Sequence, residues 1–418
     1  MHIFDVIALF IFLSGLFILI NTYYLKQPSP IGLMLLALLL SLLVLVVGNL
    51  RPDLHIAEHV REYNFKEVLN QFVISVILFA GALNMDFRRL SQYKKPVLIL
   101  SGTGVILSTF IIGTLVYFTL GLLGIELGYL YSLVFGALIS STDPISALST
   151  VRRFHLPRSL EIKIAGESLF NGAFAVVLAF LLYHIAEISQ VGEITALGVF
   201  KITLLEIGGG VSIGLLMGYI GYRLLKYVDN DSVEVEVLIT MAMVMVGSFI
   251  SEYIQVYSKM VAVVMGLMIG NLGRSKKGES AVGLYVYKFW NLLEETMAVM
   301  LFVLIGFEML VIPLRLDYFA AGFIAVNIVL FGRWLSIFIP IKLMSHSRSF
   351  HNNTIPVLTW GALKGGLPIA ISLALSDFPG KDLIITMTYV VVVCSVLYQG
   401  LSLPVLMREK YMLKRYQE

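Results

Sequence analysis

Acidic and hydroxyl side chains lie together in an otherwise apolar segment near position 140 of this 418-residue chain. The segment reads Ser140-Ser141-Thr142-Asp143-Pro144, and long apolar runs flank it on both sides. A charged side chain at the centre of a bilayer costs at least about 2.5–3.5 kcal/mol on insertion scales, so such a residue is a functional candidate by default. Oxygen atoms freed where a membrane helix unwinds can coordinate a small cation. We therefore take Thr142 and Asp143 as candidate cation ligands.

Pro144 predicts that the helix is interrupted here, because proline lacks a backbone donor and its ring clashes with the preceding turn. Asp143 and Pro144 also suit the start of a new half-helix, with aspartate as the N-cap and proline as the first helical residue. The carboxylate would then lie at the positive end of the helix dipole. The alternative is a proline kink with a capped turn and no cation site.

A second interruption falls in the apolar run from 355 to 376. A Gly-Gly pair and a proline weaken the helix within Trp360–Pro368. Lys364 would lie near the C-terminal end of the first half-helix, where a cation compensates the dipole. One interrupted span thus carries an anion and another a cation. Such paired interruptions indicate an inverted-repeat transporter with its site near the membrane midplane.

A third group of polar residues follows the first interruption, in the sequence Gly166-Glu167-Ser168-Leu169-Phe170-Asn171-Gly172. Glu167 and Asn171 are four residues apart and share one helix face. Arg333 lies in another apolar run, and a lone buried arginine needs an anionic partner, for which Glu167 is the first choice. The alternative is that this pair only holds the helix bundle together.

The elements that position these residues are predicted to be membrane-spanning helices. About 58% of the residues are hydrophobic and 14% are charged, whereas an average soluble domain has about 25% charged residues. Backbone groups cannot stay unpaired in lipid, so apolar runs of about 17–25 residues are read as helices. We predict an all-α polytopic membrane protein with about thirteen spans, near 4–20, 31–48, 67–83, 96–120, 129–150, 164–187, 197–222, 235–250, 260–272, 291–312, 319–343, 355–376 and 383–406.

Composition and motifs argue against several other classes of protein. Basic and acidic residues nearly cancel, so no nucleic-acid partner is expected. The single cysteine, Cys394, cannot form a disulfide framework, and the histidines have no metal-ligand spacing. No phosphate-binding loop or hydrolase motif is present, so no nucleotide, cofactor or enzymatic activity is expected.

Basic residues mark the loops predicted to face the cytoplasm. Lys and Arg are concentrated after the odd-numbered spans and in the C-terminal segment 408–418. The positive-inside rule therefore places the N-terminus outside and the C-terminus in the cytoplasm of a cell with the protein in its inner (plasma) membrane. The loop with Arg51 and Arg61 is the exception.

Taken together, these motifs resemble the monovalent cation:proton antiporter-1 family, the bacterial and eukaryotic Na⁺/H⁺ exchangers. The matching segments follow one another in the family's order and spacing along most of the chain. They are Leu78–Asp86, Ser141–Pro144, Gly166–Asn171, Leu301–Glu308, Arg333 and Trp360–Gly365.

The resemblance implies a thirteen-helix fold with two crossed, broken helices in an ion-carrying core. It also implies a scaffold that forms a homodimer in the lipid bilayer, an elevator-like motion of the core, and exchange of Na⁺ or Li⁺ for H⁺. On this basis 96–187 and 313–407 are predicted to be the two core repeats, broken at 140–145 and 363–368. Residues 1–95 and 188–312 are predicted to be scaffold and linker helices.

Position 172 departs from the family pattern, which has an aspartate directly after the asparagine. That carboxylate binds cation and proton in competition, and Gly172 cannot do so. The chain is then an inactivated variant, a member that uses Asp143 or Glu167 instead, or a protein that has lost coupling.

From this pattern we predict an electroneutral secondary antiporter, or a form of one that Gly172 has inactivated. Its cation site would comprise Thr142, Asp143, Ser168, Asn171 and position 172. Glu167 and Arg333 would brace the site, and Lys364 would compensate the broken helix. The alternatives are an uncoupled cation conduit and a non-transporting membrane protein with a binding or structural role.

Overall fold

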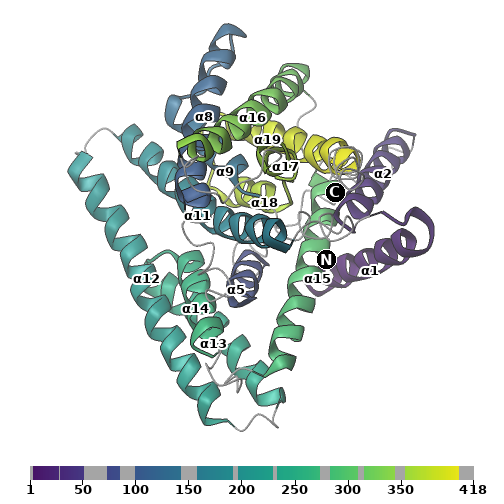
Figure 1. Cartoon of the computed structure of the whole chain (residues 1–418). Coiled ribbons are helices and arrows are strands. Elements are labelled where there is room, and N and C mark those ends of the chain that lie inside the picture. The colour runs from purple at the N-terminus through teal and green to yellow at the C-terminus, as the bar shows by residue number, and fades with distance from the viewer. Residues whose placement is uncertain are drawn as a thin grey trace, which may run out of the picture. The chain divides into compact units, whose positions relative to one another are not determined.

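The computed structural model describes residues 3–27, 29–50, 73–84, 99–142, 158–191, 196–228, 233–273, 283–308, 315–343 and 354–403. All regular secondary structure in these ranges is helical (Figure 1). Each of the thirteen predicted ranges contains helical residues, and six of the described helices are long and apolar enough to cross a membrane. The prediction of an all-α polytopic membrane protein is confirmed, while the number of spans in the whole chain stays a prediction.

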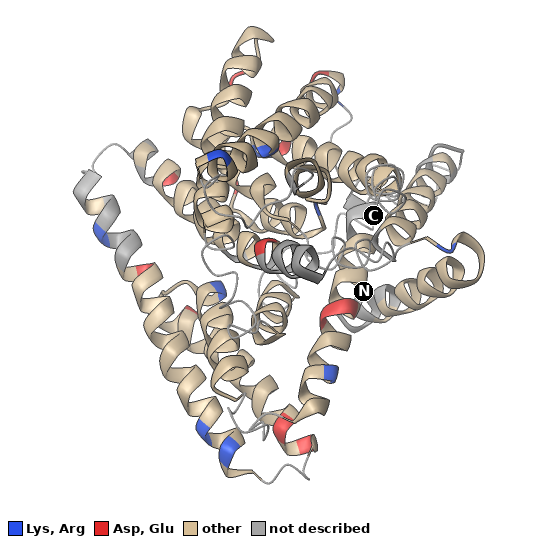
Figure 2. Ribbon diagram, viewed as in Figure 1, with Lys and Arg blue, Asp and Glu red and all other residues tan. Residues whose placement is uncertain are grey.

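Charged residues are sparse along these helices, and Figure 2 shows long stretches without one. The helix from Leu316 to Leu343 and that from Val233 to Ile254 have mean hydropathies of 1.9 and 2.0 over a membrane-length window. Large apolar side chains such as Phe249 and Phe323 are exposed on them. Such surfaces are stable against lipid rather than water.

The chain divides into two compact units, each made of discontinuous segments. The first comprises Met1–Phe65, Tyr93–Leu182 and Val299–Glu418, and the second comprises Lys66–Gln92 and Tyr183–Ala298. The first predicted core repeat, 96–187, lies in the first unit as far as residue 182, and the second, 313–407, lies there completely. Residues 1–65, which were predicted as scaffold, also belong to the first unit.

The first unit contains most of the described helices. They are α1 (Ile3–Ile20), the π-helical turn η1 (Asn21–Leu25), α2 (Ser29–Leu50), the π-helical turn η4 (Ile99–Thr103), α8 (Gly104–Leu122), α9 (Tyr129–Ser140), α16 (Leu316–Leu343), α17 (Thr354–Trp360), α18 (Leu367–Ala374), α19 (Lys381–Cys394) and the π-helical turn η5 (Ser395–Gln399). Helices α11 (Arg158–Val191) and α15 (Leu284–Glu308) each run through the boundary between the units.

Two helices of the first unit end where the sequence predicts interruptions. Helix α9 ends at Ser140, and Ser141 is extended with φ −61° and ψ 145°. Helix α17 ends at Trp360, and the chain is not helical again until α18 begins at Leu367. Pro368 lies in the first turn of α18, where proline is tolerated because no intrahelical donor is needed. The half-helix predicted after Pro144 lies outside the described residues.

Close helix contacts hold α8 against α9 in the first unit. A Cβ added at Gly136 of α9 would lie 2.5 Å from the backbone oxygen of Thr109 in α8. No side chain fits there, so the glycine permits the backbones to approach. The contact fixes the end of α9, and with it the position of Ser141 and Thr142.

The second unit contains α5 (Ile74–Asn84), α12 (Ala196–Tyr227), α13 (Val233–Ile254) and α14 (Ser258–Leu272). Helix α14 packs on both α5 and α12. A Cβ at Gly270 of α14 would lie 2.2 Å from the backbone oxygen of Leu83, and a Cβ at Gly214 of α12 would lie 2.7 Å from Val264 Cβ. The glycine-rich character of the predicted seventh span therefore serves packing against α14.

Candidate ion-binding site

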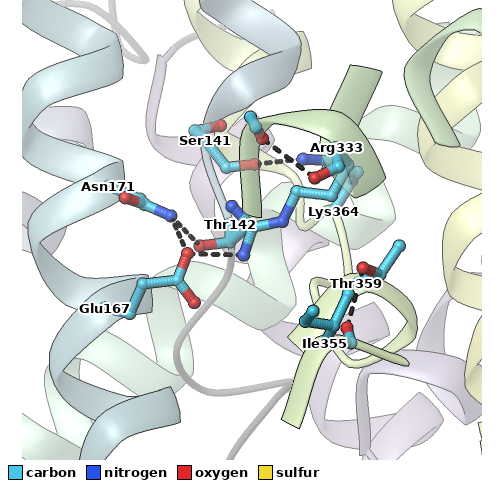
Figure 3. A network of polar contacts seen from close by, with 9 residues as sticks. Ser141, Thr142, Glu167, Asn171, Arg333, Ile355, Thr359 and Lys364 are labelled. Atoms are coloured by element: carbon cyan, nitrogen blue, oxygen red, sulfur yellow. Dashed lines mark hydrogen bonds and ion pairs between the residues drawn. The ribbon is translucent and has the colours of Figure 1, made fainter. Parts of the chain in front are cut away.

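A buried polar cluster lies in the first unit, where α9, α11, α16 and the stretch between α17 and α18 meet (Figure 3). Helix α11 contributes Glu167 and Asn171, one turn apart on the same face. The Asn171 side-chain nitrogen donates a hydrogen bond to Glu167 Oε1 at 2.5 Å. Both side chains are buried, so each needs polar partners within the protein.

Arg333 supplies the positive partner of Glu167 from the middle of α16. Its Nη2 lies 2.5 Å from Glu167 Oε1, and the two side chains are only 4% and 2% exposed. Two charges removed from water attract each other strongly in the low-dielectric interior, but each pays a desolvation penalty. The arrangement is stable only as a pair, which matches the pairing predicted from the sequence.

Thr142 joins the cluster from the extended residues after α9. The Asn171 side-chain nitrogen lies 3.4 Å from Thr142 Oγ1, so the amide group bridges Glu167 and Thr142. Its other end, Asn171 Oδ1, is a buried acceptor without a hydrogen-bond partner among the described residues. An unpaired buried acceptor is costly, and a bound cation or water would satisfy it.

Gly172 and Ser168 lie on the adjacent part of α11, four residues apart and both buried. A Cβ added at Gly172 would lie 3.9 Å from the Thr142 backbone oxygen, an ordinary van der Waals separation, and no side chain of the described residues is nearer. Among the described residues, a Cβ at position 172 therefore meets no close neighbour, and it would lie beside the Thr142 carbonyl.

Lys364 approaches the cluster from the non-helical stretch between α17 and α18. Its Nζ donates a hydrogen bond to the Ser141 backbone oxygen at 3.1 Å, and the residue is 3% exposed. Ser141 is the C-cap of α9, so the ammonium compensates the negative end of that helix. The sequence instead suggested the end of the lysine's own half-helix, α17, because nothing local indicates which helix lies opposite.

The described part of the site holds two basic side chains, Arg333 and Lys364, and one acidic side chain, Glu167. Asp143, the other predicted acidic ligand, lies outside the described residues. A carboxylate favours a bound cation, so Asp143 and the residue at position 172 bear directly on cation binding.

Two residues of the surrounding polar network were not predicted. Ser395 and Gln399 lie on η5, are 4% and 5% exposed, and reach the same stretch as Lys364. Two polar residues four apart in the apolar segment 383–406 were a signal that sequence inspection alone could have used.

The family model for the transmembrane part of sodium/hydrogen exchangers matches residues 8–409 of the chain. This match covers nearly the whole sequence, including every segment of the polar cluster. The chain belongs to the sodium/hydrogen exchanger family. The predicted family resemblance is thereby confirmed.

Relatives within the sodium/hydrogen exchanger family match over most of their length. The Na(+)/H(+) antiporter NhaP of Pseudomonas aeruginosa is 36% identical over 97% of each chain. The Na(+)/H(+) antiporter NhaH of Halobacillus dabanensis is 31% identical over 92% of each. The sodium proton antiporter MjNhaP1 of Methanocaldococcus jannaschii has the same fold, with a TM-score of 0.76 at 19% identity over 97% of each chain.

Proposed function

We propose that the chain is a secondary active antiporter that exchanges Na⁺ or Li⁺ for H⁺ without net charge movement. Two relatives that carry the name Na(+)/H(+) antiporter align with it over more than nine-tenths of both chains. The ions would be bound at the buried cluster of the first unit, and ion gradients would supply the energy.

The observation that carries this proposal is the unpaired Asn171 Oδ1. This acceptor has no hydrogen-bond partner among the described residues, and a Cβ at the next residue of the helix, Gly172, would lie beside the Thr142 carbonyl. Carbonyl, amide and hydroxyl oxygens without other partners are suitable ligands for a small cation in a broken-helix site. The positive charge of the bound ion would also satisfy an acceptor that is otherwise costly to bury.

Each cluster residue has a proposed role. The cation ligands would be Thr142, Asp143, Ser168 and Asn171. An aspartate in place of Gly172 would add a further ligand at that position. Glu167 and Arg333 would brace the ligands through their ion pair. Lys364 would compensate the broken helix through its bond to Ser141.

Gly172 bears on whether exchange is coupled. Coupling requires a group that binds either H⁺ or the cation, and a buried carboxylate has this property. With glycine here, the proton-competing group is Asp143 or Glu167, or the chain is an inactivated variant that an aspartate would restore.

The uncoupled conduit is a second candidate, because Gly172 also removes the group that would link cation flux to proton flux. The non-transporting protein with a binding or structural role is the third. They differ in what crosses the membrane: cations without protons in the conduit, and neither ion in the non-transporter.

The charge pattern and the family resemblance support a proposed placement and assembly. The protein would lie in the inner (plasma) membrane as a homodimer surrounded by lipid, with its N-terminus outside and its C-terminus in the cytoplasm. The core ranges 96–187 and 313–407 would move as an elevator relative to the scaffold ranges 1–95 and 188–312.

The proposal is tested in liposomes that contain a pH-sensitive dye, with Na⁺, Li⁺ or K⁺ added outside. Cation-evoked proton movement by the unchanged chain supports antiport. Silence that turns to activity in Gly172→Asp, and not in the uncharged, equally large Gly172→Asn, supports the inactivated form. Cation flux without proton movement supports the conduit, and silence in all three proteins supports the non-transporter.

A further inference from the structure

The stretch that carries Lys364 has an anchor outside the ion-binding cluster. The backbone N–H of Lys364 donates a hydrogen bond to Ser395 Oγ at 3.0 Å. Ser395 begins η5, a single π-helical turn that follows α19. Single π-helical turns within α-helices occur often at functional sites, because they redirect side chains.

A second bond fixes the Ser395 hydroxyl. Ser395 Oγ donates to Gln399 Oε1 at 2.5 Å, and both residues are almost completely buried. A hydroxyl has one proton, which is used toward Gln399, so its lone pairs are available to the Lys364 N–H. Gln399 thereby orients Ser395 as an acceptor for Lys364.

The local sequence provides little conformational restraint of its own. Residues 361–366 are outside any helix, and two glycines directly follow Lys364. Glycine has the largest conformational freedom of all residues, so the path of this stretch depends on bonds to other elements. Lys364 has two such bonds. Its backbone N–H donates to Ser395 Oγ on η5, and its ammonium donates to the Ser141 backbone oxygen at the end of α9.

We infer that Ser395 is a positioning residue that holds the Lys364 backbone so that the ammonium meets the Ser141 carbonyl, and that Gln399 orients Ser395. Within the described part of the site, the side-chain hydrogen bonds of Ser395 and Gln399 go to Lys364 and to each other, and not to Thr142, Ser168 or Asn171. Their effect on transport rests on the proposed function, whereas their effect on Lys364 can be measured without transport.

A mutant cycle in thermal unfolding separates positioning from ordinary stabilisation. Ser395→Ala removes the acceptor of the Lys364 N–H, and Lys364→Met removes the ammonium but keeps the backbone N–H. If Ser395 acts through the ammonium, Ser395→Ala lowers the midpoint temperature about half as much in the Lys364→Met protein as in the parent, because contacting groups are not additive. Ser395→Thr, which keeps the hydroxyl, should restore the parent midpoint.

Ser372→Ala is the matched control. Ser372 is buried in the same broken span, but its hydroxyl donates only to Ile369 O of its own helix. Its removal should lower the midpoint equally in both backgrounds. An equal effect of Ser395→Ala in both backgrounds overturns the inference, since the serine would then stabilise the fold without acting through Lys364.

If Lys364→Met does not fold, the test is hydrogen exchange in Ser395→Ala, measured in peptide 361–366 and in the region around Ser141. Faster exchange in both regions supports the inference, and faster exchange in 361–366 alone overturns it.

The transport arm uses whichever protein exchanges ions, the parent or Gly172→Asp. Ser395→Ala and Gln399→Leu should raise the Na⁺ concentration for half-maximal flux roughly two- to tenfold, the effect of one neutral hydrogen bond. Ser372→Ala should leave it unchanged. If neither the parent nor Gly172→Asp exchanges or binds cations, the proposed function fails, while the unfolding cycle still decides the role of Ser395.

Discussion

The ammonium of Lys364 and the backbone oxygen of Ser141 form a hydrogen bond of 3.1 Å that connects positions 223 residues apart. Each residue lies in a helix interruption, one in each of the predicted inverted repeats. The cation of one interruption therefore compensates the carbonyl end of the helix in the other. The first interruption therefore depends on the second for the partner of its Ser141 carbonyl, whereas the Lys364 backbone N–H is bound within its own repeat by Ser395.

Loss of either partner of the buried Glu167–Arg333 ion pair should strongly destabilise the folded protein. Arg333→Ala leaves Glu167 charged and unpaired in the interior, which costs about 3–5 kcal/mol. The change should appear as a large fall in the thermal unfolding midpoint. The double variant Arg333→Met with Glu167→Gln should recover part of the loss, because no uncompensated charge remains.

The exposed pair of Arg315 with Asp317 is the control for this prediction. Its side chains are 57% and 41% exposed, so solvent screens their interaction. Arg315→Ala should leave the midpoint unchanged within error. Equal midpoints for Arg333→Ala and the parent would contradict the buried pair.

Asn171 should be required for cation binding. In the Gly172→Asp protein, Na⁺ or Li⁺ should raise the unfolding midpoint, because a ligand that binds only the folded state stabilises it. Asn171→Leu, which removes Oδ1 and the amide bridge, should abolish that rise. Asn327→Leu is a suitable control, since Asn327 is exposed on α16 and donates only to Phe323 O of its own helix. A cation-dependent rise that survives in Asn171→Leu would exclude Asn171 as a ligand.

Close backbone contact in the second unit makes a further, independent prediction. Gly270→Ala places a Cβ where only 2.2 Å separates it from the Leu83 oxygen, so α14 and α5 must move apart. Overpacking of this kind costs about 1–3 kcal/mol. Gly208→Ala on α12 meets no atom of the described residues within 4 Å and should not lower the unfolding midpoint, since alanine favours a helix over glycine. Comparable midpoints for the two variants would show that the α14–α5 approach is looser than described.

Local features of this fold were predictable from the sequence, whereas contacts between distant elements were less so. The end of α9 at Ser140 follows from a proline a few residues later, and the shared face of Glu167 and Asn171 follows from helix periodicity. The Glu167–Arg333 pair was predictable because a buried charge needs a partner and few were available.

The acceptor of Lys364 was not predictable, because a carbonyl acceptor has no residue type. Every residue carries a backbone oxygen, and only the crossing of the two interrupted spans selects that of Ser141. The bond from the Lys364 backbone to Ser395 was equally hidden, since it depends on how α19 packs and on the π-helical turn at η5.

Proton release on cation binding tests the central claim most directly. Na⁺ binding to the unchanged chain, Gly172→Asp and Gly172→Asn is measured by titration calorimetry in two buffers with different ionisation enthalpies, which gives the number of protons released per ion. We predict a release approaching one proton per Na⁺ for Gly172→Asp at pH values below the pKa of its carboxyl, falling to about half a proton at the pKa, and none for Gly172→Asn. Tight Na⁺ binding by Gly172→Asp without proton release, or the same release from all three proteins, would contradict competition of cation and proton at position 172.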